Sequence, residues 1–131
     1  MTITGIGGFF FRANDPKALS AWYLEHLGVG GEHGQWQQQA GPSVFAPFKQ
    51  STEYFAADKQ FMLNLRVSDL DGLLARLRAS GIEVITSPDW DSPETGRFAR
   101  IHDPEGNALE LWEPPTDLRG DGLDGGRADN R

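Results

Sequence analysis

The sequence contains no cysteine, which excludes a disulfide framework, a thiolate zinc site and a cysteine nucleophile. It has only three histidines, His26, His33 and His102, and this limits any histidine-based metal site before geometry is considered. No apolar run approaches the roughly 18 residues that a membrane span needs. The first residues also lack the basic start and apolar stretch of a signal peptide. We therefore expect a soluble, cytoplasmic protein with no membrane partner.

Basic residues are outnumbered as well. The chain carries 12 Lys and Arg against 19 Asp and Glu, which gives a formal net charge of −7. Because an acidic domain repels phosphate backbones, a nucleic-acid partner is not expected. The length of 131 residues suits one domain, and a hydrophobic content of 38% is enough to build a core.

Two helices are predicted by their start and stop signals. Asp15 can cap the free amides of the first helix, Pro16 suits its first turn, and Gly28 supplies its stop. The second helix begins after Ser68-Asp69 and ends at a glycine. Its apolar residues recur at the helical period and form one stripe: Leu70, Leu73, Leu74 and Leu77.

The remaining apolar runs have the lengths and flanking turn residues of strands. We expect strands over residues 4–13, 35–40, 43–47, 61–67, 82–85, 97–102 and 108–112. Three successive aromatics, Phe9, Phe10 and Phe11, favour a first strand buried on both faces. The last two strands flank a turn at 103–107, which predicts a hairpin. From Pro114 onward the composition becomes rich in Gly and Asp, so residues 115–131 are predicted to be a disordered polar tail.

The two halves of the chain resemble each other. Residues 11–15 match residues 65–69 at an offset of 54 positions, and Leu19 and Leu73 keep the same offset. Each half therefore predicts a strand, a helix and then a run of strands. Units of this size can bury their open sheets only by packing together, either within the chain or across a dimer. The sequence leaves both arrangements open.

The repeat, the Asp-Pro-Glu-Gly-Asn turn at 103–107 and the Leu-Glu-Leu-Trp-Glu strand after it resemble the vicinal oxygen chelate superfamily. This superfamily includes glyoxalase I, bleomycin-resistance proteins and extradiol dioxygenases. The resemblance spans roughly residues 4–114. It implies an α+β domain over residues 1–114, in which two βαβββ modules (about 4–48 and 60–114) form a curved mixed-sheet cup around a small-molecule site. We expect the domain to form a homodimer.

The resemblance also implies where a metal would bind. Metal-bearing members of the superfamily take ligands from the first and last strands of each module, and the matching positions here are Gly8, Phe45, Met62 and Glu110. Gly and Phe offer no donor, and a thioether is a poor ligand for Zn²⁺, Ni²⁺ or Fe²⁺. We therefore expect no metal or other cofactor. Glu110 and His102 are the remaining candidate ligands of a displaced metal site.

Alternation along the strands predicts which side chains line the cup. If the turn sets a symmetric register, Arg100 pairs with Glu110 and Phe98 pairs with Trp112. An Arg100–Glu110 pair would satisfy the buried carboxylate without a metal. The predicted ligand-binding residues combine an apolar floor with a few polar groups: Phe10, Arg12, Phe45, Met62, Asn64, Arg66, Phe98, Arg100, Glu110 and Trp112.

Two loops, 50–59 and 86–96, carry further aromatic side chains, including Tyr54, Phe55 and Trp90. They predict either flaps that stack on a ligand or segments that pack on the surface and shield sheet edges. Both interpretations stay open.

Three functions compete at this point. The leading hypothesis is a metal-free binder of a small aromatic or anionic molecule, similar to the bleomycin-resistance branch of the superfamily. The alternative is a metal-dependent glyoxalase-like lyase or isomerase, or a dioxygenase, with a displaced site at His102 and the candidate catalytic residue Glu110. The third is a domain used only as a scaffold. Whether the protein is an enzyme is left open.

Overall fold

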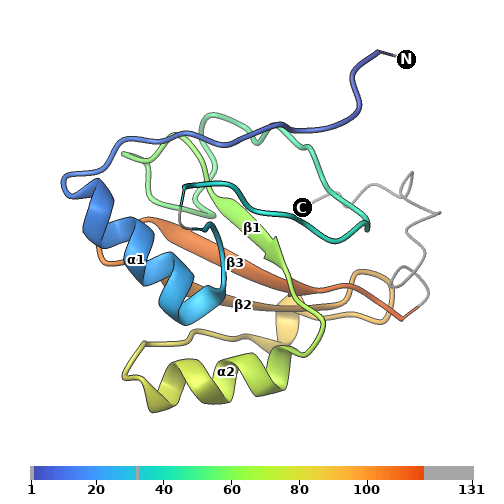
Figure 1. Cartoon of the computed structure of the whole chain (residues 1–131). Coiled ribbons are helices and arrows are strands. Elements are labelled where there is room, and N and C mark those ends of the chain that lie inside the picture. The colour runs from blue at the N-terminus through green and yellow to red at the C-terminus, as the bar shows by residue number, and fades with distance from the viewer. Residues whose placement is uncertain (1, 32, 117–131) are drawn as a thin grey trace.

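The computed structural model describes residues 2–31 and 33–116, and Figure 1 shows the arrangement of its elements. Helix α1 (Pro16–Leu27) comes first. It is followed by strand β1 (Leu63–Arg66), helix α2 (Leu70–Ala79), the 3-10 helix η1 (Pro88–Trp90), strand β2 (Arg97–His102) and strand β3 (Ala108–Glu113). In the part of the chain that is described, no helix is long and apolar enough to cross a membrane.

The three strands form one mixed sheet in the order β1-β3-β2. β3 is central, because it pairs with β1 in parallel and with β2 in antiparallel fashion. Ile85 adds a single antiparallel bridge to Arg100 on β2. The strand expected over 82–85 is thus reduced to this one bridge. The structure is thus a small α+β fold with a mixed sheet, as predicted.

Both predicted helices are confirmed, together with their caps. The side chain of Asp15 accepts a hydrogen bond from the Ala18 amide at 3.1 Å, and Gly28 ends α1 with a left-handed φ of 67°. At the start of α2, Asp69 accepts from the Gly72 amide at 3.1 Å. Short polar side chains at these positions satisfy amides that have no partner inside the helix, which explains why the ends were predictable.

The core lies between the helices and one face of the sheet. That face presents alternate strand residues, and both helices contribute their apolar stripes to the same cluster. Each fully buried leucine contributes about 1.5–3 kcal/mol relative to an exposed one. The buried members are Leu19, Tyr23, Leu65, Leu70, Leu74, Leu77, Ala99, Ile101, Leu109 and Leu111.

The turn between β2 and β3 is fastened to α1 by two carboxylates. Asp103 is buried, and its Oδ2 accepts a hydrogen bond from the Tyr23 hydroxyl at 2.6 Å. The Glu105 carboxylate accepts from the backbone amides of Asn14 and Asp15 at 2.7 and 2.9 Å. The acidic residues of this motif therefore have structural roles, because they hold the hairpin turn against the beginning and the inner face of α1.

The first half of the chain does not form the strands expected over 4–13, 35–40 and 43–47. Among the described residues, strands occur only between Leu63 and Glu113. Phe10 is 92% exposed and Phe9 is 45% exposed, so the prediction of a first strand buried on both faces is wrong. The reason is physical: a side-chain pattern specifies the faces of a strand, whereas its backbone needs a partner strand.

Some alternation nevertheless survives in this extended segment. The ring of Phe11 lies 5.8 Å from that of Phe61 and 6.3 Å from that of Tyr23, whereas Phe10 points to solvent. In Figure 1 the N-terminal segment runs above the sheet, with α2 below it. At the other end, Pro114 and Pro115 are buried, and the predicted tail lies outside the described residues from position 117 on.

Candidate functional site

The sheet face opposite the helices carries polar side chains in register. Asn64 and Arg100 are the partners of Glu110 on either side of β3, and Arg66 and Phe98 are the partners of Trp112. The predicted hairpin register is therefore confirmed. We call the surface formed by these six side chains the cup face: Asn64, Arg66, Phe98, Arg100, Glu110 and Trp112.

Glu110 lies at the centre of the cup face and is 2% exposed. Its Oε1 accepts a hydrogen bond from Asn64 Nδ2 at 2.7 Å, and its Oε2 accepts one from the Tyr54 hydroxyl. A buried carboxylate is costly unless donors surround it. The strand neighbour and the loop residue together supply such donors, and neither contact was predicted from the sequence.

Arg100 lies beside Glu110 and connects both aromatic loops to the cup face. Its Cζ atom is 4.7 Å from the ring centroid of Tyr54 and 5.9 Å from that of Trp90. Its Nη2 contacts the sulfur of Met62 at 3.5 Å. Its Nε is buried and has no hydrogen-bond partner among the described residues. Tyr54 and Trp90 thus contact Arg100 on the cup face.

Phe98 and Trp112 form an inner wall of the cup face. Their rings stack with centroids 6.4 Å apart and planes 9° apart. Trp112 Nε1 donates to the Thr95 carbonyl at 2.7 Å, which fixes the indole and links it to the 86–96 loop. With exposures of 2% for Phe98 and 5% for Trp112, these rings support the site and present little surface to a ligand.

Arg66 holds the segment around Gly41. Its guanidinium donates to the Pro42 carbonyl and, at 2.6 Å, to the Gln39 carbonyl. A Cβ added to Gly41 would come within 2.9 Å of the guanidinium, so the segment passes close to the end of the Arg66 side chain. Arg66 therefore anchors the chain on which Phe45 lies.

The other three predicted residues come from the first half of the chain and are all exposed. Phe10 and Phe45 are 92% and 88% exposed, and Arg12 is exposed too. Within a single chain these side chains therefore do not form the apolar floor that was expected beneath the cup face. The structure thus brings together the predicted residues of the second half and leaves those of the first half open to solvent.

Among the described residues, the four positions matching the superfamily's metal ligands offer one carboxylate and no histidine. No group of three or more His, Asp or Glu side chains that could hold a metal ion occurs in the described ranges. Gly8 has no side chain, the Met62 thioether contacts Arg100, and His102 is exposed at the end of β2. Arg100 and Glu110 are register partners, but no ion pair joins these two described residues, so the pair that was expected to satisfy the carboxylate does not form.

The other histidines have no place in the site. His26 packs its ring 5.4 Å from that of Trp22 on α1, and His33 is exposed.

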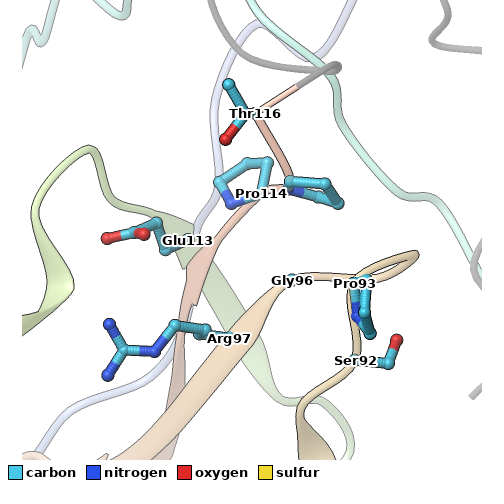
Figure 2. A pocket seen from close by; sticks show the side chains of 8 residues that line it. Ser92, Pro93, Gly96, Arg97, Glu113, Pro114 and Thr116 are labelled. Carbon is cyan, nitrogen blue, oxygen red and sulfur yellow. The ribbon is translucent and has the colours of Figure 1, made fainter.

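A separate pocket of about 500 Å³ lies where β2 begins and β3 ends, and Figure 2 shows its lining. In this view Arg97 and Glu113 point away from Ser92 and Pro93. Arg97 donates to Asp71 at 2.7 Å and holds the pKa of that carboxylate below its usual value, and Glu113 accepts from the Leu70 amide at 2.8 Å. No predicted site residue lines this pocket, so it is distinct from the cup face.

Comparison with known proteins places the fold in a family. The Glyoxalase-like domain family matches residues 8–112. No curated protein sequence matches significantly.

One similar solved structure is TnmS3, an antibiotic binding protein from Streptomyces sp. CB03234, which is 27% identical to this chain. The match covers 87% of this chain and 98% of TnmS3, with a TM-score of 0.53. A glyoxalase/bleomycin resistance protein from the same organism is 25% identical over 76% of this chain and 92% of its own, with a TM-score of 0.44. The oxidase ChaP-H2 is 20% identical over 82% and 91% of the two chains, with a TM-score of 0.47. The family match covers most of the chain, and together with the TnmS3 fold it supports the resemblance to the vicinal oxygen chelate superfamily. The chain belongs to the glyoxalase-like domain family.

Proposed function

We propose that this protein binds a small aromatic molecule carrying an anionic or carbonyl oxygen, and that it does so on the cup face without a metal. The observation that carries the proposal is the buried Nε of Arg100, which lacks a hydrogen-bond partner among the described residues. It lies on a side chain that also contacts the rings of Tyr54 and Trp90. The protein thus offers a hydrogen-bond donor next to aromatic surface. A ligand that consists of an aromatic ring with an acceptor oxygen would be complementary to both.

An unsatisfied buried donor is expensive. Leaving such a group without a partner costs about 1–3 kcal/mol, and more when the group is charged. A ligand oxygen placed on Arg100 would recover this free energy, and the bond would be charge-assisted. The neighbouring rings would add apolar contact area, so affinity and orientation would come from the same few residues.

The comparison with TnmS3 supports small-molecule binding in general. TnmS3 is described as an antibiotic binding protein, and its similarity extends over nearly its whole length. The aromatic and anionic character of the ligand proposed here comes from Arg100, Tyr54 and Trp90. The alternative metal-dependent lyase, isomerase or dioxygenase would need Glu110 as a ligand, and within the described residues this carboxylate accepts hydrogen bonds from Asn64 and Tyr54.

We also propose that the protein works as a homodimer. Two extended segments in the first half of the chain expose large apolar side chains, notably Ile3, Ile6, Phe10 and Phe45. Their sequence repeats the pattern of the second half, which does form a sheet. A second copy of the chain would supply the missing strand partners and cover this apolar surface.

Calorimetric titration tests the binding proposal with two naphthalene derivatives that differ in one group. We expect 2-naphthoate to bind the wild type and 2-naphthalenemethanol to bind at least about tenfold more weakly. Arg100→Met keeps an apolar side chain but removes the donors, and it should weaken 2-naphthoate binding to the level of the alcohol. Arg78→Met, at an exposed position on α2, is the matched control and should bind like the wild type. Equal binding of both compounds, or full affinity in Arg100→Met, would refute the proposal.

A further inference from the structure

We propose that Met62 is a modification site, at which a peroxide oxidises the thioether to a sulfoxide whose oxygen then binds the Arg100 guanidinium and blocks the ligand. The proposal rests on the proposed function, because it names a chemical signal that regulates the same site. It goes beyond that function by giving a regulatory role to a residue that touches Arg100 from outside the cup face.

Met62 lies directly before β1 and faces the same side of the sheet as the cup face. Its neighbour Leu63 packs against the core, whereas the Met62 sulfur lies 3.5 Å from Nη2 of Arg100. This is the alternation expected along a strand. Met62 is only partly buried, which leaves it within reach of a small reagent from solvent. The residue is thus both accessible and adjacent to the guanidinium.

In its thioether form, Met62 leaves a donor of Arg100 available. A thioether sulfur is a weak hydrogen-bond acceptor, whereas a guanidinium carries five N–H donors. The Nε of Arg100 is buried and has no hydrogen-bond partner among the described residues. A strong acceptor introduced at the position of the sulfur would therefore find a charged donor beside it.

Oxidation converts the weak acceptor into a strong one. The sulfur attacks one oxygen of the peroxide, so that an S–O bond forms and the O–O bond breaks. The second oxygen takes up the proton and leaves as water or an alcohol, and the peroxide is reduced by the two electrons that the sulfur loses. The product is polar, where the thioether is apolar. Because methionine has three rotatable bonds, the new oxygen can turn to the guanidinium whichever lone pair carries it.

The oxidised side chain then competes with the ligand for Arg100. A hydrogen bond from the guanidinium to the sulfoxide oxygen satisfies the charged donor that the ligand oxygen would otherwise satisfy. The ligand has to displace this internal acceptor before it binds, and its affinity falls. Reduction of the sulfoxide returns the weak acceptor and reopens the site.

The composition of the chain simplifies the test of this reaction. The sequence has no cysteine and two methionines, Met1 and Met62, so oxidation at sulfur is confined to these two positions. Met62 is the one with a contact to Arg100 in the part of the chain that the structure describes. A loss of binding on oxidation can therefore be assigned with a single substitution.

The test treats the whole chain with hydrogen peroxide and locates added oxygen on Met62 and Met1 by peptide mass spectrometry. We expect 2-naphthoate to bind the protein oxidised at Met62 at least about tenfold more weakly than the untreated protein, and methionine sulfoxide reductase to restore the affinity. Met62→Leu keeps Met1 but has no sulfur at position 62, so its own affinity should be the same before and after peroxide. Met62→Gln holds an amide oxygen at this position permanently, and it should bind 2-naphthoate at least about tenfold more weakly than Met62→Leu.

The Nε–H resonance of Arg100, which is missing from the spectrum of Arg100→Met, reports on the same contact without ligand. It should shift when Met62 is oxidised. The proposal is overturned if Met62 stays unoxidised under conditions that oxidise Met1, if oxidation leaves this resonance unchanged, or if Met62→Leu loses as much affinity as the wild type. A resonance that shifts in a protein that binds no 2-naphthoate in either form would refute the proposed function and still support the sulfoxide contact.

Discussion

Asn64 and Glu110 lie opposite each other on β1 and β3, and the amide of Asn64 donates to the carboxylate of Glu110 at 2.7 Å. The bond joins two neighbouring strands across the cup face. It fixes a buried acceptor at the point where Tyr54 and Arg100 converge. The stability of the sheet and the preparation of the site therefore depend on the same pair.

Breaking this pair should destabilise the protein in a non-additive way. Asn64→Leu removes the donor and leaves the buried carboxylate short of one bond, so we expect the free energy of unfolding in urea to fall by about 1–3 kcal/mol. Adding Glu110→Gln to that variant should cost less than Glu110→Gln alone, with a coupling of about 0.5–3 kcal/mol. Gln37→Leu, at an exposed position, is the control. Strict additivity of the two substitutions would contradict the contact.

Tyr23 should make stability depend on alkaline pH. Burial, followed by the hydrogen bond to Asp103 and the charge of that residue, raises the pKa of Tyr23 well above its usual value of 10.0. The folded state therefore keeps the proton above pH 10, while the unfolded state loses it. The free energy of unfolding should fall by up to about 1.4 kcal/mol per pH unit above this pH.

Tyr23→Phe isolates this contribution. Urea unfolding at about pH 9 and at about pH 11 should show a smaller decrease in the variant than in the wild type, because Phe has no proton to release. An equal decrease in both proteins would mean that Tyr23 titrates normally in the folded state.

Glu105 should protect the beginning of α1. Its carboxylate accepts from the amides of Asn14 and Asp15, so Glu105→Gln replaces one acceptor oxygen with a donor. We expect a loss of about 1–3 kcal/mol in stability and faster hydrogen exchange at these two amides. Glu94→Gln, at an exposed position, should change neither quantity. Unchanged exchange at Asn14 and Asp15 would show that the carboxylate does not hold the helix start.

The exposed phenylalanines test the homodimer. Sedimentation of the wild type should give twice the chain mass of 14.4 kDa. Phe10→Asp combined with Phe45→Asp should give the chain mass itself with an unchanged helical spectrum, because neither side chain is buried within one chain. Leu24→Asp changes another exposed apolar residue, on α1, and should leave the dimer intact. A monomeric wild type would contradict the homodimer proposal.

The sequence predicts best where the signals are local. Both helices follow from the caps Asp15 and Asp69 and from the stripes between them and the next glycine. The pairing of Arg100 with Glu110 follows from the five-residue turn, which the Asp103 amide closes by bonding to the Asn107 carbonyl at 3.0 Å. In each case the residues that determine the structure are close together in the chain.

Long-range pairing is where the sequence predicts least. The aromatic run at Phe9–Phe11 has the composition of a strand, but composition does not state which strand lies beside it. The contact of Tyr54 with Glu110 spans 56 positions and comes from a loop without periodicity, so only the aromatic character of that loop gave a signal. The elements that were confirmed depend on local sequence preferences. Those that did not form would have needed a partner strand that the sequence does not specify.

Ligand binding on the cup face can be followed at the Arg100 side chain itself. The Nε–H resonance of Arg100 in a nitrogen-resolved NMR spectrum is assigned by its absence in Arg100→Met. On addition of 2-naphthoate, we predict that this resonance shifts and that its exchange with water slows, because the buried Nε–H would donate a hydrogen bond to a ligand oxygen. Binding of 2-naphthoate that leaves the Arg100 resonance unchanged would place the ligand elsewhere and contradict the account.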